Sequence, residues 1–375
     1  MRIQIVGGGP GGLYFGLLMK RVDPSHQITV FERDAAGETF GWGVAFSEQA
    51  FAYLRDTDQA VYDQFRGRAV TWNHLDIVHR DQRVRVRGTP FAGIARLALL
   101  DILHRRCLQS GVALKFQSNV RDLRALPDCD LLVGADGANS LVRHTFAEAF
   151  QPDLRIGRNK YVWLGVRHRL DGYTLSVRPT RAGVFAAHAY PHSDEASTVV
   201  IECGETTWAR AGLNAKTDHE ACVLLSDIFT QELSGHLLLT ADRMKWRNFL
   251  LIANDRWFHQ HVVLLGDALH TVHFSTGAGT RLALEDAIAL ARAFEEHRLV
   301  PAALAAYEAT RRPAVTDTQT FARESLAWFE RLDRAMTLSP PVLAHEAVTK
   351  TRRLDAAQIR DLDPAFAARV EQARS

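Results

Sequence analysis

A glycine-rich loop close to the N-terminus constrains the fold of this chain more than any other feature. Residues Arg2 to Val6 alternate and end in apolar side chains, as a buried β-strand does, and the run GGGPGG follows at positions 7–12. Leucines at helical spacing come next, at positions 13, 17 and 18. The order of strand, tight turn and helix predicts the first unit of an α/β fold built on a parallel sheet.

Three of these glycines have separate roles in such a unit. Gly7 permits the tight turn, Gly9 lets the backbone approach a pyrophosphate, and Gly12 lets the helix pack closely on the strand. A second predicted strand, at residues 27–31, ends in Glu32, 20 residues after Gly12, where an acidic side chain accepts hydrogen bonds from a ribose. This order predicts a dinucleotide-binding unit. NAD and FAD both remain open at this point, because they share the adenosine diphosphate half.

Two later segments also have the pattern of a buried strand that ends in a turn. One holds Asp136 and Gly137 after an apolar run, and the other ends in Gly266 and Asp267. A second glycine loop at 277–280 then opens a long predicted helix. Ligands of open α/β sheets gather at the carboxyl ends of the strands, so we expect these loops to lie around one ligand.

With these three segments in this order, the chain resembles the single-domain FAD-dependent aromatic monooxygenases of the para-hydroxybenzoate hydroxylase type, over roughly residues 1–330. The resemblance implies a Rossmann-like FAD-binding domain of the GR2 type. It also implies reduction of FAD by NADH or NADPH, reaction with O₂ to a C4a-hydroperoxide, and attack by an electron-rich ring. The residues that it implies at FAD are Gly7, Gly9, Gly12, Glu32, Arg33, Arg96, Asp136, Asp267, Gly277, Ala278, Gly279 and Thr280.

Further motifs narrow the resemblance to one branch of that family. They are FGWGV at 40–44, RNKYVW at 158–163, AHAY at 187–190, ETTW at 205–208 and HFSTGAGT at 273–280, where the proline of commoner members is absent. The branch includes salicylyl-CoA 5-hydroxylase, the monooxygenase part of 2-aminobenzoyl-CoA monooxygenase/reductase and the violacein-pathway tryptophan hydroxylase.

The branch implies hydroxylation of an activated aromatic substrate. The leading expectation is an aryl-CoA thioester such as salicylyl-CoA, hydroxylated at its 5-position. Two alternatives stay open: a tryptophan or indole hydroxylase of a pigment or alkaloid pathway, and a non-catalytic binding module that keeps only the flavoprotein fold.

The middle of the chain has a different pattern from the two ends. Residues 161–203 contain β-type runs between Asp-Gly, Pro and His-Ser-Asp turn signals, which predicts an inserted β-sheet that binds the substrate. We therefore expect a discontinuous FAD-binding domain, a substrate domain and a C-terminal helical segment. Their ranges are 1–75, 95–150 and 260–330 for the first, 76–94 and 151–259 for the second, and 331–375 for the third.

Oxygen transfer to a ring needs a pocket that excludes water and holds the ring in place. A histidine, with an ordinary pKa of about 6.5, suits the activation of a phenol or aniline. His273, just before the glycine loop, and His188, on the predicted substrate sheet, are the catalytic candidates, although both also suit a structural role. The candidates for the pocket wall are Trp42, Val44, Phe46, Phe185, Tyr190 and Phe274.

Charge and composition argue against several other classes of protein. The 45 Lys and Arg nearly balance the 43 Asp and Glu, so there is no basic field for nucleic acid. No stretch approaches the roughly 20 apolar residues of a membrane span, and no secretory signal is present, so we expect a cytoplasmic protein without a membrane partner. The cysteines and histidines lack metal-ligand spacing, so no metal is expected. The expected partners are an aromatic small molecule, with or without a CoA link, and O₂.

Overall fold

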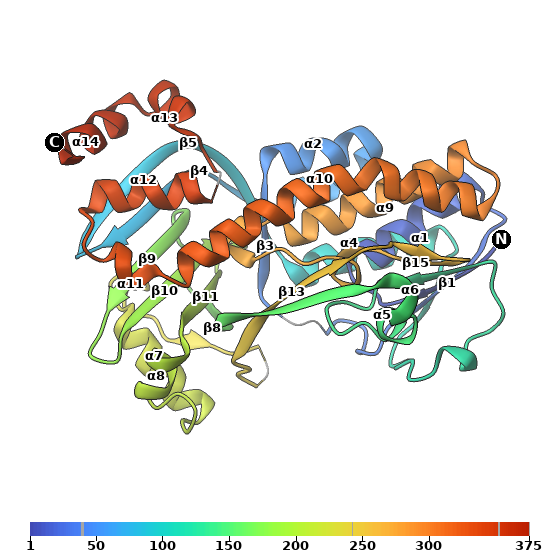
Figure 1. The fold of residues 1–375 in the computed structure, drawn as a ribbon, viewed down its shortest axis with the longest axis horizontal. Coiled ribbons are helices and arrows are strands. Elements are labelled where there is room, and N and C mark those ends of the chain that lie inside the picture. The colour runs from blue at the N-terminus through green and yellow to red at the C-terminus, as the bar shows by residue number, and fades with distance from the viewer. Residues whose placement is uncertain (39–40, 242, 352, 375) are drawn as a thin grey trace.

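The molecule is elongated, with one β-sheet toward each end, in a computed structural model that describes residues 1–38, 41–241, 243–351 and 353–374 (Figure 1). Phe40, part of the motif at 40–44, lies outside these described residues. The N-terminus lies at the end formed by the first sheet, and the C-terminal helices lie at the end formed by the second.

The first sheet is the α/β sheet that the glycine loop predicts. Its strand order is β14-β15-β7-β1-β2-β6, and all neighbouring strands are parallel except β14 and β15. Ile5 of the central strand pairs in register with Val30 and Val133 on either side, and all three are buried in the core. The strands are β1 (Arg2–Val6), β2 (Gln27–Phe31), β6 (Ala113–Lys115), β7 (Leu131–Gly134), β14 (Phe258–His259) and β15 (Val262–Leu264).

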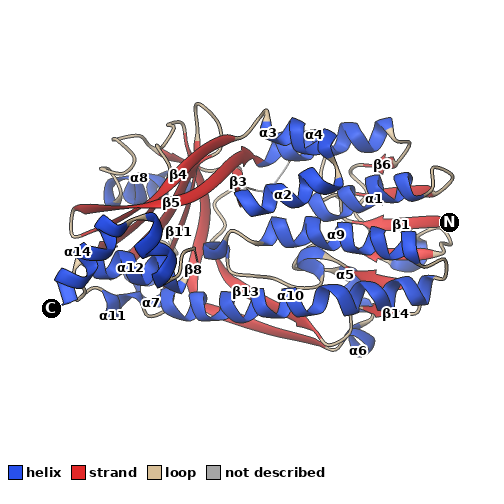
Figure 2. Ribbon diagram, turned by 90° about the horizontal axis from the view of Figure 1, so that it is seen from above, coloured by secondary structure: helices blue, strands red, loops and turns tan. Residues whose placement is uncertain are grey.

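The second sheet is mostly antiparallel, with strand order β12-β8-β11-β10-β9-β4-β5-β3, and β13 pairs with β8. The β-type runs that the sequence predicts between 161 and 203 fall in β8 to β11. The long strands β8 and β13 run from this sheet toward the first (Figures 1 and 2). The strands are β3 (Gly43–Ser47), β4 (Val70–His79), β5 (Gln82–Ala95), β8 (Pro152–Val166), β9 (Tyr173–Pro179), β10 (Val184–Pro191), β11 (Ser197–Gly204), β12 (Leu238–Leu239) and β13 (Arg247–Asn254).

Residues 43–47 and 70–75 pair within this second sheet, whereas the sequence pattern groups them with the FAD-binding domain. Hydrogen bonding to strands that are distant in the sequence determines which sheet these residues join, so a local sequence pattern cannot predict it. The domain boundaries themselves stay a prediction.

Alternation along the strands gives the second sheet two different faces. Ala186 and Tyr190 of β10 belong to a core with the C-terminal helices, whereas Phe185 and Ala187 belong to a core on the other face with Leu225 of α8. The face that carries Tyr190 also adjoins the glycine loop at 277–280.

Helices cover both sheets, and helix α10 joins them. Tyr307 of α10 donates a hydrogen bond to the Leu264 carbonyl in the first sheet (3.3 Å), and Phe329 at its other end packs beside His188 in the second. The helices are α1 (Pro10–Val22), α2 (Glu48–Thr57), α3 (Gln59–Arg66), α4 (Arg96–Gln109), α5 (Leu141–Thr145), α6 (Ala147–Phe150), α7 (Glu205–Arg210), α8 (Asp218–Ile228), α9 (Gly279–Glu296), α10 (Val300–Phe329), α11 (Leu332–Ala335), α12 (Pro340–Lys350), α13 (Ala356–Leu362) and α14 (Pro364–Arg374), with 3₁₀ turns η1 (Leu123–Ala125), η2 (Gly266–Ala268) and η3 (Phe274–Thr276).

The C-terminal helices complete one core of the second sheet. Leu343, Ile359 and Phe366 are buried against Leu75 and Val86 of β4 and β5. Within the described ranges, no helix is both long enough and apolar enough to span a lipid bilayer.

Candidate active site

The first glycine loop leaves an open space at the start of α1. Gly7 has φ +109°, and a Cβ there would lie 2.2 Å from the Ala135 carbonyl oxygen, so only glycine fits. A Cβ on Gly12 would lie 2.3 Å from the Gly7 oxygen, whereas a Cβ on Gly9 would meet nothing within 4 Å. The loop therefore closes against β1 and β7 and stays open at Gly9, where the sequence predicts a pyrophosphate.

Glu32 reaches back from the end of β2 to this loop. The Gly8 amide donates to Oε2 (2.8 Å) and the Asp34 amide donates to Oε1 (2.9 Å). Each carboxylate oxygen keeps a further lone pair, so the group is held in position and can still accept from ribose hydroxyls. The Arg33 side chain is 66% exposed beside Asp34, so the structure does not direct it into the loop.

Asp136 and Arg143 order the second loop. One Asp136 oxygen accepts from the amides of Leu141 and Val142 at the start of α5, while its other oxygen is buried without a partner among the described residues. Burial raises the pKa of this carboxyl. The buried Arg143 donates to the carbonyls of Ala138 and Ala268 and so ties this loop to the Gly266-Asp267 turn. The sequence pattern by itself indicates no role for Arg143.

Asp267 of the third loop and Arg96 at the start of α4 are electrostatic neighbours. Desolvation by the surrounding protein raises the pKa of Asp267 although its side chain is exposed, and the charge of Arg96 opposes that rise. Desolvation likewise lowers the pKa of the half-buried Arg96, against the charges of Asp267 and Glu32. Arg96 thus interacts electrostatically with both Asp267 and Glu32, which relates the first loop to the third.

The last glycine loop leads into α9. Gly277 has φ +63° and lies near the Ala45 carbonyl of β3, and a Cβ on Gly279 would meet nothing within 4 Å. A Cβ on Gly11 in α1 would lie 3.1 Å from the Ala283 carbonyl oxygen, so the N-terminal turns of α1 and α9 are adjacent. Below the loop, His270 bonds Asp286 (2.7 Å), which also pairs with Arg311, in a buried structural network.

These features fit FAD as a ligand. The cradle has two open glycine positions at adjacent helix N-termini: Gly9, where backbone N–H groups favour the pyrophosphate, and Gly279, in the loop predicted to face the isoalloxazine. It also has a backbone-held carboxylate for the ribose, and Arg96 beside Asp267 for the middle of the molecule. The structure thus brings the three predicted segments together, and the individual contacts with FAD stay predictions.

A cluster of aromatic rings lies next to the third loop, between η3 and the second sheet. The centroid of the Phe274 ring lies 5.0 Å from the ring centroid of Tyr161, 5.3 Å from that of His188 and 4.0 Å from that of His273. Phe329 of α10 closes the cluster at 4.8 Å from His188. The cluster is aromatic and adjoins the loop predicted to face the isoalloxazine.

His188 lies at the centre of a buried hydrogen-bond chain on the second sheet. Its Nε2 lies 2.8 Å from Glu202, its Nδ1 lies 2.8 Å from the Tyr173 hydroxyl, and Asn159 donates to the other Glu202 oxygen (2.9 Å). Burial opposes ionisation of Glu202, but the hydrogen bond from His188 and the nearby histidines leave its pKa below the ordinary value. The carboxylate therefore favours the proton on Nε2 of His188, so that Nδ1 accepts from Tyr173. The sequence pattern identifies His188 as a candidate but not its partners Tyr173 and Glu202, nor Asn159, which bonds Glu202.

His273 has a different environment. Its Nδ1 lies 2.8 Å from the Ser275 hydroxyl, which in turn bonds Ser325 of α10 (2.8 Å). Burial lowers the pKa of His273 to about 4, so the ring is neutral at pH 7 and a weak base.

The structure divides the six candidates for the pocket wall. Phe274 is in the ring cluster, and Tyr190 is near it on the same sheet face, stacked on Tyr173 and donating to the Gly43 carbonyl (2.9 Å). Trp42 and Val44 lie on the β3 side, where the Trp42 carbonyl accepts from the Arg96 amide. Phe46 packs against Phe51 in the core of the first sheet, and Phe185 points to the opposite face of the second sheet. Phe185 and Tyr190 lie on opposite faces because side chains alternate along a strand. The local sequence does not show which of the two faces points toward the site.

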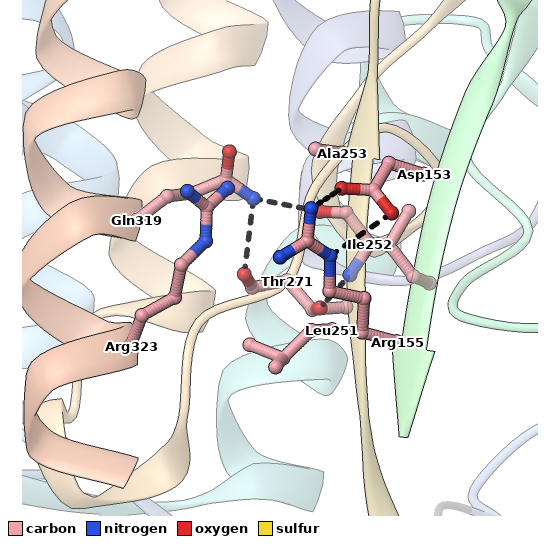
Figure 3. Close-up of a pocket in the computed structure, with 8 residues that line it drawn as sticks. All are labelled: Asp153, Arg155, Leu251, Ile252, Ala253, Thr271, Gln319 and Arg323. Atoms are coloured by element: carbon pink, nitrogen blue, oxygen red, sulfur yellow. Dashed lines mark hydrogen bonds and ion pairs between the residues drawn. The ribbon is translucent and has the colours of Figure 1, made fainter. Parts of the chain in front are cut away.

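A small cavity between α10 and the β8–β13 ribbon is not part of this site. Figure 3 shows Gln319 of α10 donating to the carbonyls of Ile252 and Thr271, next to the Asp153–Arg155 ion pair. Its volume of about 10 Å³ holds at most one water molecule. It is a packing gap along the seam between the two sheets.

Comparisons with known protein families and proteins also assign FAD as the ligand of the cradle. Residues 109–322, more than half of the chain, match the family described as an FAD binding domain. The chain is 40% identical to salicyloyl-CoA 5-hydroxylase of Streptomyces sp over 89% of its own length, and it spans 66% of that longer relative. It is 34% identical to protodeoxyviolaceinate monooxygenase of Chromobacterium violaceum, covering 90% of this chain and 91% of the relative. It is 38% identical to 3-hydroxy-4-methyl-anthranilyl-[aryl-carrier protein] 5-monooxygenase of Streptosporangium sibiricum, covering 88% and 90%.

A solved structure shows the same fold at lower sequence similarity. The tetrameric form of 2-methyl-3-hydroxypyridine-5-carboxylic acid oxygenase superposes with a TM-score of 0.73 at 20% identity, covering 94% of this chain and 98% of that one. These matches confirm the predicted fold class and the predicted family branch.

Proposed function

This chain belongs to the FAD-dependent aromatic monooxygenases, and from that premise we propose that it hydroxylates an aromatic acid carried as a CoA thioester, with salicylyl-CoA hydroxylated at position 5 as the leading substrate. The observation that carries the proposal is the buried Tyr173–His188–Glu202 chain next to the ring cluster. It provides a proton acceptor for a ring hydroxyl, which salicylyl-CoA has. The 40% identity to salicyloyl-CoA 5-hydroxylase supports the same substrate class.

FAD, when bound, supplies the activation of O₂ with electrons from NAD(P)H. Gly9, Glu32, Arg96, Asp267 and Gly279 would hold it, and the cradle geometry supports this assignment. The protein must then bind the ring, exclude water and move a proton. These three tasks fall to the ring cluster and to the chain around His188.

The proton path follows from the hydrogen bonds. A ring hydroxyl placed at Tyr173 loses its proton to the Tyr173 oxygen, while the Tyr173 proton passes to Nδ1 of His188. Glu202 stabilises the resulting imidazolium from Nε2, because the carboxylate stays ionised. A deprotonated hydroxyl donates electron density to the ring and makes its carbon atoms more nucleophilic.

Water exclusion is the task of the aromatic side chains. Phe274, Phe329 and Phe249 enclose His188 and His273 with ring contacts between 4.0 and 6.2 Å. A dry site preserves the reactive oxygen species for transfer to the ring. The low pKa of His273 favours a role in this wall over the role of general base, which we assign to His188.

A second candidate function is hydroxylation of a tryptophan-derived indole. It is favoured by the protodeoxyviolaceinate monooxygenase relative, of which the chain covers 91%, against 66% of the salicyloyl-CoA relative. Family membership favours either enzyme over a non-catalytic binding module.

The test uses the FAD-loaded protein with NAD(P)H and O₂. Salicylyl-CoA, 2-aminobenzoyl-CoA and tryptophan are compared for stimulation of NAD(P)H oxidation and for hydroxylated product by mass spectrometry. We expect coupled product with an aryl-CoA ester. Release of hydrogen peroxide alone with every aryl-CoA ester would overturn the leading substrate, and coupled product with tryptophan would establish the second candidate.

A further inference from the structure

An arginine from the C-terminal segment reaches the site from outside both predicted domains. The Arg353 guanidinium carbon lies 4.0 Å from the ring centroid of Tyr173 and 5.1 Å from that of Phe91. Its Nη2 donates to the Ser275 carbonyl (3.2 Å), two residues before Gly277. The guanidinium is thus held at the junction of the second sheet and the last glycine loop.

The backbone fixes this side chain in place. The Arg353 amide donates to the Val348 carbonyl (3.1 Å) in the turn that ends α12, and the Thr351 hydroxyl donates to Ala347 (2.7 Å). The next residue, Leu354, is buried in the core beneath the C-terminal helices. A guanidinium held by rings and by a fixed backbone loses little conformational entropy on binding a ligand.

The charge of Arg353 has no carboxylate partner among the described residues. The ionisable groups that act on it are Tyr173 and Tyr190, and burial lowers its pKa without removing its charge. The buried Arg311, by contrast, pairs with both Glu285 and Asp286 at 3.1 Å. A desolvated cation without an anion is costly, so this position favours an anionic ligand.

Arg353 also adjoins the proton path. Its guanidinium lies over the face of the Tyr173 ring, whose hydroxyl donates to His188. When a ring hydroxyl passes its proton through Tyr173 to His188, the O–H bond of the substrate breaks and its electron pair stays on oxygen. The negative charge then forms next to the guanidinium.

We propose that Arg353 binds the negatively charged oxygen substituent on the ring of the aromatic substrate, a phenolate or a ring carboxylate. The inference rests on the proposed monooxygenase function and adds a specificity-determining residue to it. Of the five guanidinium N–H groups, one donates to the Ser275 carbonyl, so a ligand can still be bound by the others.

The test measures ligand affinity, separately from turnover. Wild type, Arg353→Gln, Arg353→Lys and the exposed control Arg360→Gln on α13 are titrated in their FAD-loaded form, with flavin absorbance as the readout. The ligands are salicylyl-CoA, benzoyl-CoA, salicylate and benzoate. Flavin content and thermal unfolding of each variant report whether it folds.

We expect Arg353→Gln to weaken salicylyl-CoA by about 10-fold or more, Arg353→Lys to weaken it less, and Arg360→Gln to leave it unchanged. Benzoyl-CoA, which lacks the ring hydroxyl, should lose less than about 3-fold, which identifies a phenolate. An equal loss for salicylate and benzoate identifies a carboxylate. Equal weakening of both CoA esters by Arg353→Gln, or unchanged affinity for every ligand, overturns the inference.

The two proposals fail in different ways. If the wild type binds neither CoA ester, the proposed substrate is wrong. Arg353 is then judged on salicylate and benzoate, and affinities that do not depend on Arg353 overturn its role. If the wild type turns over salicylyl-CoA and Arg353→Gln binds it equally well, the function stands and the role of Arg353 is overturned.

Discussion

The flavin cradle and the ring cluster are built in different ways. The cradle is mostly backbone: Gly7, Gly9 and Gly279 define its shape, and each belongs to a loop between a strand and a helix. The ring cluster is made of side chains from β8, β10, α10 and the turn before α9, and Glu202 of β11 bonds its His188. A site built from backbone therefore tolerates no added Cβ at glycines that touch a neighbouring strand. A site built from side chains depends on hydrogen bonds and charges, which single substitutions remove one at a time.

The substitution Gly7→Ala tests the backbone-built cradle and has the largest expected effect. A Cβ there collides with the Ala135 carbonyl at a positive φ, so we expect a loss of about 4 kcal/mol in the free energy of unfolding, together with loss of bound flavin. Urea unfolding and flavin absorbance measure the two effects. The matched control is Gly9→Ala, which meets no protein atom and should weaken flavin binding at unchanged stability of the flavin-free protein. Equal stability of the two variants would contradict a backbone-built cradle.

The pH dependence of stability tests the side-chain site. Burial lowers the pKa of His273 from 6.5 to about 4, so the folded state binds fewer protons than the unfolded state between these values. The stability that His273 contributes is complete above about pH 6.5 and is lost as the pH falls toward 4, by on the order of 3 kcal/mol. His273→Gln should flatten the urea-unfolding profile between pH 7 and 4. The exposed His219→Gln should not, and an unchanged slope in His273→Gln would refute the assignment.

Removing the base separates catalysis from cofactor binding. His188→Gln should lower the rate of product formation about 100-fold while leaving the flavin content unchanged, because His188 touches the ring cluster and not the glycine loops. Rates of product formation by chromatography give the first value, and absorbance of the purified protein gives the second. His168→Gln, whose ring stacks on His236 away from the cluster, is the control. A full rate in His188→Gln would show that the substrate needs no base.

The smallest effect is expected at the contact between the two regions. Ser325→Ala removes the 2.8 Å hydrogen bond from α10 to Ser275, while Ser275 keeps its bond to His273. We expect a loss of about 1 kcal/mol in stability by urea unfolding and no change in flavin content. A loss of flavin from Ser325→Ala would mean that the cradle depends on α10 and is not built by its own backbone.

Most of the cradle could be predicted from the sequence. Gly7, Gly9, Gly12 and Glu32 lie within one strand–helix–strand unit, so short spacings along the chain determine their positions, and the two later loops follow the same rule. The ring cluster was only partly predictable. His188 and Phe274 lie in recognisable motifs, but Glu202, Asn159 and Tyr173 meet His188 only through the pairing of β8, β9, β10 and β11.

The sequence by itself determined the parallel α/β sheet, the converging glycine loops and the family, because glycine conformation and strand periodicity act over a few residues. Only the tertiary structure decided that Phe185 faces away from Tyr190, that Glu202 is the partner of His188, and that Arg353 among many C-terminal arginines reaches the site. The physical reason is that these relations depend on strand register and on the docking of distant helices, which are set by packing across the whole molecule.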